Sequence, residues 1–343
     1  MSLDAPSVLQ SSPQPLVETH DALLVDLDGV VQLDDQPVPG APDVLGRVRD
    51  RGLRVAFITN NAARAPEEVA ARLSRLGVEA APTEVVTSSM AAADVLAAAL
   101  PPGAEVLVIG GPGLWAAIAG VGLQPVRSAE SRPPAVAQGW GPDVAWRDLA
   151  EGAVALRAGA RWVVTNRDAT LPSPRGPLPG SGSLVAALVT ATGLEPADVV
   201  GKPGPSLFEA ARRRTGAERP LVVGDRLDTD IAGAVNAGMP SLVVLTGVSR
   251  PLDLLSAEPP ARPSYLGRDI AALEIPHPPV VVEGERVSCG QVTVTSDGIV
   301  QRSSASASSG DGLDGLRAAC VLAWRGVLDP DRFDGVLRDL DLA

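Results

Sequence analysis

Residues 22–30 read Ala-Leu-Leu-Val-Asp-Leu-Asp-Gly-Val, a buried-strand pattern that runs directly into two carboxylates, Asp26 and Asp28. Between the strand-like runs lie amphipathic stretches such as residues 66–76, which begin with Pro66 and two glutamates and are followed by a glycine. This alternation predicts an α/β fold with a doubly wound parallel sheet covered by helices, and ligands beyond the carboxyl ends of its strands. Further runs of branched apolar residues are predicted as strands buried on both faces: 54–59, 106–109, 162–165, 221–223 and 242–245.

Composition narrows the classes of protein and of site. A chain of 343 residues, 45% apolar, is long enough for about two domains. Its net charge of -12 disfavours nucleic acid and anionic membranes as partners, because both attract a surplus of cations. The first twenty residues lack a cationic start and an apolar stretch, which predicts a cytoplasmic location. Cys289 and Cys320 are the only cysteines and no Cys/His spacing indicates zinc, so any metal is expected to bind oxygen.

Polar residues follow the first two predicted strands. Asp26 and Asp28 are two residues apart, so strand alternation points both side chains the same way. Carboxylates so close require a cation or a shared proton. The second strand ends in Thr59, Asn60 and Asn61, whose hydroxyl and amides can donate to a phosphate oxygen, although the same residue types often cap helices.

The chain contains a single lysine, Lys202, in the segment Val-Val-Gly-Lys-Pro-Gly-Pro of residues 199–205, and every other basic side chain that is always charged is arginine. A compact ammonium and a planar guanidinium are not equivalent at a ligand site, so Lys202 is a candidate site residue, although a single lysine can also remain by chance. Residues 222–230, Val-Val-Gly-Asp-Arg-Leu-Asp-Thr-Asp, form another strand that ends in carboxylates, including Asp225 and Asp230.

The ordered set DLDGV, ITNN, GKP and GDRLDTD resembles the haloacid dehalogenase superfamily of aspartyl-phosphate-forming phosphatases, over about residues 20–270. The stretches TNNAARAPEEVAARLSRLGV and VVGDRLDTDIAGAVNAGMPSLVVLTGV are similar to the branch of nitrophenylphosphatases, phosphoglycolate phosphatases and glycerol-phosphate phosphatases, with the closest likeness to the actinobacterial members of the last group. The resemblance implies a core domain with an inserted α/β cap of type C2. The spacing agrees, because about 140 residues separate Asn61 from Lys202 whereas only a short helix fits between Val30 and Arg54.

The predicted organisation has four parts: a flexible N-terminus (1–19), a catalytic core (20–100 and 200–275), a cap that selects substrate (101–199) and a small α+β C-terminal accessory module (276–343). Within the module, residues 280–282 and 291–294 are predicted as strands, 303–312 as a linker or long turn, and the last thirty residues as two helices. A homodimer interface on the cap or the module is a further expectation.

The resemblance also assigns roles. Asp26 is the expected nucleophile and Asp28 the general acid and base. Mg²⁺ is the expected cofactor, held by Asp26, the backbone carbonyl of Asp28 and Asp225, with Asp230 orienting this shell. The groups expected to hold the phosphoryl oxygens are Thr59, Asn60, Asn61 and Lys202.

In the cap, Asn166, Asp168 and Arg175 are candidate substrate contacts, although a rigid turn that satisfies its own backbone explains each of them equally well. A closing cap favours a small phosphomonoester. Glycerol 3-phosphate is the first expectation, with phosphoglycolate or another small sugar or polyol phosphate as the alternative.

Three other functions are weighed against this one. Residues 111–116 contain G-x-G-x-x-A after a strand, with Glu130 downstream, which imitates a dinucleotide-binding loop, although Pro112 occupies the turn that must present N–H groups. A phosphomutase of the same superfamily is disfavoured by the cap position. A non-catalytic phosphate-binding module does not need both a nucleophile and an acid.

Overall fold

The computed structural model of the chain describes residues 9–171, 175–303 and 310–342. It divides into two compact units, one made of Met1–Ala56, Leu76–Glu79 and Thr215–Ala343 and the other of Phe57–Arg75 and Ala80–Arg214. The predicted limits of core, cap and accessory module stay predictions, as does the flexible character of residues 1–19. The predicted linker at 303–312 falls largely on residues 304–309, which lie outside the described part of the chain.

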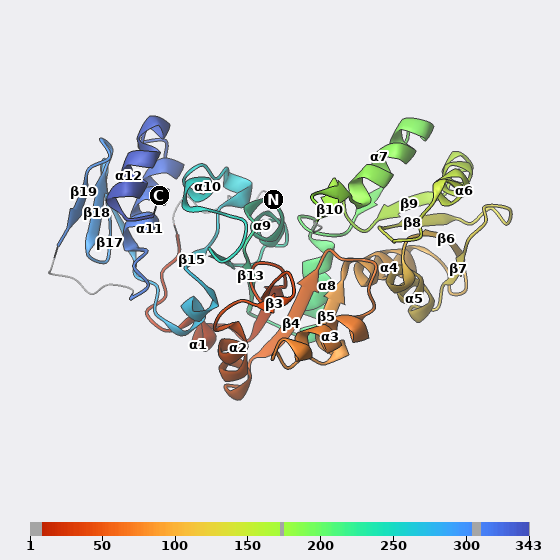
Figure 1. The fold of residues 1–343 in the computed structure, drawn as a ribbon, viewed down its shortest axis with the longest axis horizontal. Coiled ribbons are helices and arrows are strands. Elements are labelled where there is room, and N and C mark those ends of the chain that lie inside the picture. The colour runs from red at the N-terminus through yellow and green to blue at the C-terminus, as the bar shows by residue number, and fades with distance from the viewer. Residues whose placement is uncertain (1–8, 172–174, 304–309, 343) are drawn as a thin grey trace. The chain divides into compact units, whose positions relative to one another are not determined.

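The first unit contains parallel strands in the order β15-β14-β13-β1 (Figure 1). β1 (Ala22–Asp26) pairs with β13 (Pro220–Gly224), and Leu24 lies opposite Val222. Every residue of both strands is buried, as expected for strands covered on two faces. The other elements of this part are β14 (Ser241–Val244), β15 (Tyr265–Gly267), the short hairpin β2 (Gln32–Leu33) and β3 (Gln36–Pro37), α1 (Leu16–Thr19), α2 (Ala41–Asp50), the π-helical turn η2 (Leu227–Ile231), α9 (Ala232–Asn236), α10 (Pro251–Leu255), η3 (Pro259–Ala261) and η4 (Ile270–Glu274).

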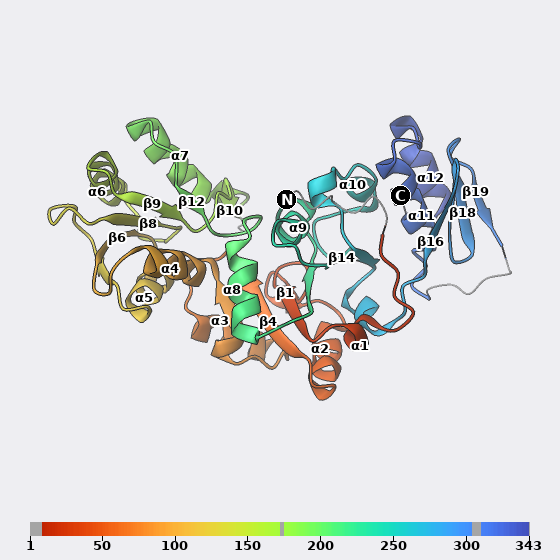
Figure 2. The ribbon, with the colours of Figure 1, turned by 180° about the vertical axis from the view of Figure 1, so that it is seen from behind.

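The chain after residue 275 belongs to the same unit. Its strands form an antiparallel meander, and α11 and α12 lie on one face of it (Figure 2). One hydrophobic core joins Val287 and Leu316 of this extension with Leu254 of α10 and Leu266 of β15. The elements are β16 (Val280–Glu283), β17 (Arg286–Cys289), β18 (Val292–Thr295), β19 (Val300–Arg302), α11 (Asp314–Trp324), η5 (Pro330–Arg332) and α12 (Phe333–Asp339).

The second unit contains a five-stranded parallel sheet in the order β12-β9-β8-β6-β7. α6 and α7 cover one face of this sheet, and α4 and α5 lie on the other (Figure 1). The unit also holds the pair β4 and β5, in which Thr59 lies opposite Thr87. Its elements are β4 (Arg54–Thr59), which begins in the first unit, α3 (Pro66–Arg75), η1 (Pro82–Glu84), β5 (Val85–Thr87), α4 (Ser88–Ala99), β6 (Glu105–Ile109), α5 (Pro112–Gly120), β7 (Gln124–Val126), β8 (Ala135–Gln138), α6 (Trp146–Arg157), β9 (Arg161–Val164), β10 (Thr170–Leu171), β11 (Leu178–Pro179), α7 (Ser181–Thr192), β12 (Asp198–Val199) and α8 (Ser206–Thr215).

The parallel α/β fold predicted from the sequence is confirmed, and the six strand-like runs match β1, β4, β6, β9, β13 and β14. The helix predicted at 66–76 is α3 (Pro66–Arg75), whose first turn holds Pro66 and two glutamates and whose last turn is basic, so both ends suit the helix dipole. In the extension, β16 and β18 match the two predicted strands, whereas β17 and β19 were not predicted.

The glycine-rich turn before α5 does not have the space of a dinucleotide site. A Cβ on Gly113 would lie 2.6 Å from the carbonyl oxygen of Arg64, and a Cβ on Gly111 would lie 3.0 Å from Ala63 Cα. The N–H of Gly113 donates to the carbonyl of Ala63 at 3.0 Å. The two glycines therefore allow this turn to pack closely against residues 63 and 64. This packing explains why the sequence resembles a pyrophosphate-binding loop.

No helix within the described residues is long and apolar enough to cross a membrane.

Arg317 links α11 to β15 through a hydrogen bond. Its guanidinium is almost fully buried, donates to the carbonyl of Leu266 at 2.6 Å, and pairs with Asp311 at 2.6 Å and Asp314 at 3.4 Å. Removing one member of such a buried group leaves charges and a carbonyl without their partner.

We expect Arg317→Met to lower the free energy of unfolding by about 3 to 5 kcal/mol, the usual loss when one partner of a buried ion pair is removed. Urea unfolding of both variants measures it, with Arg325→Met, an exposed arginine at the end of the same helix, as the matched control. Equal midpoints for the two variants would show that Arg317 does not hold the extension.

Candidate active site

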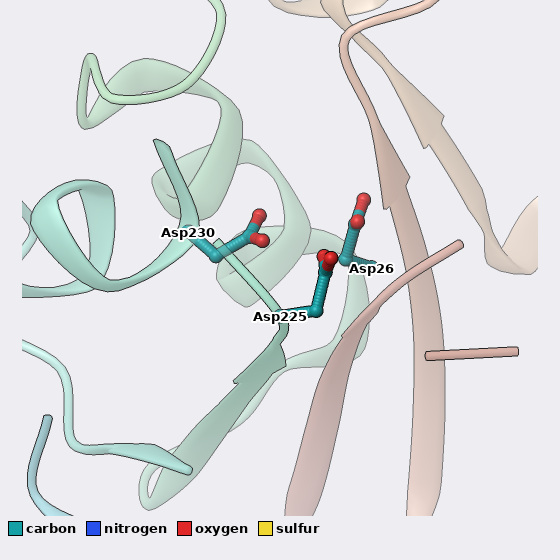
Figure 3. A group of neighbouring side chains, drawn as sticks. All are labelled: Asp26, Asp225 and Asp230. Atoms are coloured by element: carbon teal, nitrogen blue, oxygen red, sulfur yellow. The ribbon is translucent and has the colours of Figure 1, made fainter. Parts of the chain in front are cut away.

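Three buried carboxylates gather in the first unit where strands end. Asp26 is the last residue of β1, Asp225 follows β13, and Asp230 lies in the turn η2 (Figure 3). Each offers one oxygen, and these atoms lie within 4.8 Å of one another. Asp26 is 7% exposed, Asp225 1% and Asp230 0%. Like charges this close and this dry require a compensating cation.

The backbone is packed tightly around Asp225. A Cβ on Gly29 would lie 2.3 Å from the Asp225 Oδ2 atom, and one on Gly247 would lie 1.9 Å from it. Gly29 also has a φ of +84°, which disfavours a side chain there in any case. The N–H of Val248 donates to Asp225 Oδ2 at 2.7 Å, so one carboxylate oxygen is fixed by the main chain. These glycines were not predicted as site residues.

Asp230 is held by the turn that contains it, because its Oδ2 atom accepts from the N–H of Arg226 at 3.1 Å. A Cβ on Gly224 would lie 2.2 Å from Asp230 Cβ, so the last residue of β13 must be small. From the sequence, Asp230 is predicted to orient the metal ligands and not to be one of them. The structure places its carboxylate in the same cluster as Asp26 and Asp225.

The donor set suits a hard divalent cation. It consists of carboxylate oxygens only, with no thiol or imidazole among the grouped side chains of the described residues. Mg²⁺ prefers oxygen ligands and uses a small number of carboxylates. The residues that are present therefore fit the metal that the sequence predicts.

Asp28 differs from Asp26 in its surroundings. β1 ends at Asp26, so strand alternation does not extend to Asp28, which is exposed in the following turn. Its Oδ1 atom accepts from Gln32 Nε2 at 2.9 Å. The turn is anchored at the next residue, because Thr246 Oγ1 donates to the carbonyl of Gly29 at 2.5 Å.

A second group of predicted residues meets in the second unit, around Asn60. Asn60 Oδ1 accepts from the N–H of Lys202 at 2.8 Å, and Asn60 Nδ2 donates to the carbonyl of Lys202 at 3.1 Å. The same Nδ2 donates to Asp168 Oδ2 at 3.3 Å. Asn166 Nδ2 donates to the carbonyl of Asn60 at 2.9 Å. The segment after β4 thus binds both the lysine segment and the segment after β9.

Lys202 itself is 6% exposed. The residue before it has to be glycine, because a Cβ on Gly201 would lie 2.3 Å from the carbonyl oxygen of Thr165 and 2.6 Å from Asn60 Oδ1. A buried ammonium on a rigid backbone is a suitable group to bind an anion.

The remaining candidates are less involved in this network. Thr59 is buried at the end of β4, and its Oγ1 accepts from the N–H of Asn61 at 3.1 Å. Asn61 is exposed, and its Oδ1 accepts from the N–H of Ala63 at 3.0 Å. This bond is a turn-stabilising contact, and a contact of Asn61 with phosphate stays a prediction. Arg175 is exposed between β10 and β11, next to residues 172–174, which the structure does not describe.

Cys289, Cys320 and His277 are buried, and His20 is half-buried. Burial raises the pKa of the Cys289 thiol to about 12 and raises the pKa of Cys320 as well. Burial lowers the pKa of His20 and of His277, so both rings are neutral near pH 7. Reactive thiolate or imidazolium chemistry is therefore not supported at these four positions.

Comparison with known proteins agrees with this geometry. Residues 23–124 match the family described as haloacid dehalogenase-like hydrolase, and residues 199–273 match the HAD-hydrolase-like family. The chain is 48% identical to the D-glycerol 3-phosphate phosphatase of Mycobacterium tuberculosis over 317 residues, which is 90% of this chain and 87% of the relative. It is 34% identical to an acid sugar phosphatase of Staphylococcus aureus over 256 residues, 74% of this chain and 96% of the relative.

Among solved structures, the chain is similar to the glycerol phosphate phosphatase of Mycobacterium tuberculosis in complex with magnesium. The TM-score is 0.82 at 43% identity, and the match covers 96% of this chain and 100% of that one.

We expect Mg²⁺ to stabilise the protein through the carboxylate cluster, by about 2.7 kcal/mol at a concentration a hundred times its Kd. Thermal unfolding with and without Mg²⁺ measures this, and Asp225→Asn should lose most of the gain. The matched control is Asp228→Asn, an exposed carboxylate three residues away that pairs with Arg226 at 2.7 Å. Equal stabilisation of all three proteins would place the metal elsewhere.

Proposed function

The chain belongs to the haloacid dehalogenase-like hydrolases, and we propose that it is a Mg²⁺-dependent phosphatase that hydrolyses a small phosphomonoester through an aspartyl phosphate. The observation that carries this proposal is the buried cluster of Asp26, Asp225 and Asp230, whose oxygens lie within 4.8 Å of one another. A family hydrolase with such a cluster can hold a cation against a phosphoryl group. The nucleophile is then one of the same carboxylates.

In the first step of the proposed reaction, an oxygen of Asp26 attacks phosphorus. The bond from phosphorus to the ester oxygen breaks, its electron pair goes to that oxygen, and Asp28 gives it a proton so that a neutral alcohol leaves. Asp26, Asp225 and the Asp28 carbonyl would hold Mg²⁺, with Asp230 beside them, and the ion would supply positive charge that offsets the phosphoryl and carboxylate charges.

In the second step, the Asp28 carboxylate takes a proton from water as the water oxygen attacks phosphorus. The bond between phosphorus and Asp26 breaks, and orthophosphate leaves with Asp26 regenerated. The exposure of Asp28 supports this assignment, because a group that exchanges protons with alcohol and water has to be reachable by both.

We assign Lys202 and Thr59 to the phosphoryl oxygens, as a point cation and a hydroxyl donor. The structure favours a different role for the side chain of Asn60, which binds the Lys202 backbone at two atoms. Asn60 then positions the lysine. Asn61 supports the turn between Thr59 and Ala63.

Glycerol 3-phosphate is the substrate that we propose first, because the relative at 48% identity is named for it and the match covers most of both chains. Phosphoglycolate or another small sugar or polyol phosphate is the alternative, and the likeness to an acid sugar phosphatase supports that class. We keep Asn166, Asp168 and Arg175 as proposed substrate contacts. Asn166 and Asp168 are both hydrogen-bonded to Asn60, which in turn binds the Lys202 backbone. These bonds place the two cap residues next to the lysine segment.

The proposed partner is the small substrate, and not nucleic acid or membrane, since the net charge is -12. A cytoplasmic location stays a prediction. Self-association through the cap is supported by Trp146 and Val154 of α6, which are 81% and 55% exposed. The alternative interface is the C-terminal extension.

The substrate proposal is tested by phosphate release from a panel of both glycerol phosphates, phosphoglycolate, a sugar phosphate and nitrophenyl phosphate, each with Mg²⁺ and with chelator. We expect Mg²⁺-dependent release with glycerol 3-phosphate turned over fastest. A different leading ester would keep the mechanism and change the substrate. No release from any ester would favour a non-catalytic binding module or a mutase.

The roles of Asp26 and Lys202 are tested by two substitutions, each of which introduces a side chain similar in size to the one it replaces. Asp26→Asn should lower kcat at least about a thousandfold, as the loss of a covalent nucleophile does. Lys202→Arg should lower it about a hundredfold, because the guanidinium fork cannot occupy the position of the ammonium. Steady-state kinetics with Asp228→Asn as control measures both, and near wild-type turnover by either variant would contradict its assignment.

A further inference from the structure

Gln32 is a buried polar side chain next to the carboxylate of Asp28. It is 4% exposed, and its Nε2 atom donates to Asp28 Oδ1 at 2.9 Å. Its Oε1 atom is also buried and has no hydrogen-bond partner among the described residues. A buried amide with an unsatisfied oxygen is unfavourable for stability alone. The contact with Asp28 gives this amide a function.

The backbone holds Gln32 in place for this contact. The N–H of Gln32 donates to the carbonyl of Leu27 at 2.9 Å, and the carbonyl of Gln32 accepts from the N–H of Gly29 at 2.7 Å. Gln32 then pairs with Pro37 across the hairpin of β2 and β3. The Gln32 backbone is thus hydrogen-bonded to the residues on both sides of Asp28, which fixes the point from which the Gln32 side chain starts.

Asp28 needs such a partner because it is exposed. An exposed carboxylate samples several rotamers, and fixing one of them costs side-chain entropy unless a hydrogen bond selects it. Acid catalysis depends on this selection, because the proton has to be placed within hydrogen-bond reach of the leaving oxygen. A bond from Gln32 to Oδ1 leaves Oδ2 to face the substrate.

We infer that Gln32 is a positioning residue that orients Asp28 for proton transfer to the leaving alcohol. This inference rests on the proposed function. Oδ1 of Asp28 is an acceptor both in the carboxylate and in the acid that carries its proton on Oδ2, so Gln32 Nε2 can hold Asp28 in both forms. Gln32 acts only through Asp28 and does not touch the reacting atoms.

The test uses the dependence on the leaving group. Gln32→Met removes the amide and keeps the side-chain length. We expect kcat/KM to fall about tenfold for glycerol 3-phosphate, whose alkoxide is strongly basic and needs the acid. For acetyl phosphate and nitrophenyl phosphate, whose leaving groups are weak bases, we expect a fall of less than about twofold. The matched control is Gln36→Met, an exposed glutamine in the same hairpin.

A merely structural role would lower kcat/KM equally for all these substrates, and that result would overturn the inference. A second readout uses glycerol 3-phosphate alone: in an Asp28→Asn background, Gln32→Met should have almost no further effect, whereas an undiminished tenfold loss would also overturn it. Circular dichroism and Mg²⁺-induced stabilisation report whether each variant is folded. A wild-type protein without any turnover would instead overturn the proposed function.

Discussion

Three carboxylates within 4.8 Å of one another, all nearly excluded from solvent, are the constraint around which this end of the sheet is built. At an effective dielectric constant of about 20, two unit charges at that separation repel by about 3 to 4 kcal/mol. Parallel strands gather these carboxylates by bringing their carboxyl ends to one edge of the sheet, and a cation bound there would offset the repulsion. The close approach of Gly29 and Gly247 to Asp225 follows from the same need for a compact, preorganised site.

In the second unit the main constraint is different: the buried ammonium group of Lys202 has to be held in place. A lysine side chain has four rotatable bonds, so the backbone from which it starts must be fixed if the charge is to be fixed. Asn60 does this with a single amide that binds both the N–H and the carbonyl of Lys202. Gly201 allows the close approach, and Asn166, which follows β9, donates to the carbonyl of Asn60. The backbone from which the Lys202 side chain starts is thus fixed by these contacts.

The sequence predicts the fold class and much of the site, because both depend on local signals. Apolar runs that end in Asp26, Thr59 or Asp225 indicate strands and mark the residues at their carboxyl ends. The single lysine identifies Lys202 without any knowledge of contacts. The hydrogen-bond partners of the side chains could not be predicted from the sequence. Which backbone atoms face Asn60, and that Gln32 reaches Asp28 rather than solvent, depends on how segments pack.

The same limit explains the missed strands and the glycine turn. β17 reads Arg-Val-Ser-Cys and β19 reads Val-Gln-Arg, each with a single β-branched residue, whereas the predicted strands β16 and β18 are rich in valine and threonine. Gly111 and Gly113 match a ligand-binding pattern because a glycine that approaches a pyrophosphate and one that approaches Ala63 obey the same steric rule. Only the structure shows which neighbour is present.

The C-terminal extension shares a hydrophobic core with α10 and β15, and this shared core limits how members of the family can differ in length. Leu254 and Leu266 belong to the α/β part of the first unit, yet they are covered by residues that come after position 275. A shorter relative that ends soon after the strand equivalent to β15 would present those positions to water, so polar residues should replace leucine there. Gain or loss of the extension in evolution would then require compensating substitutions on α10 and β15, and the two sets of residues should vary together among homologues.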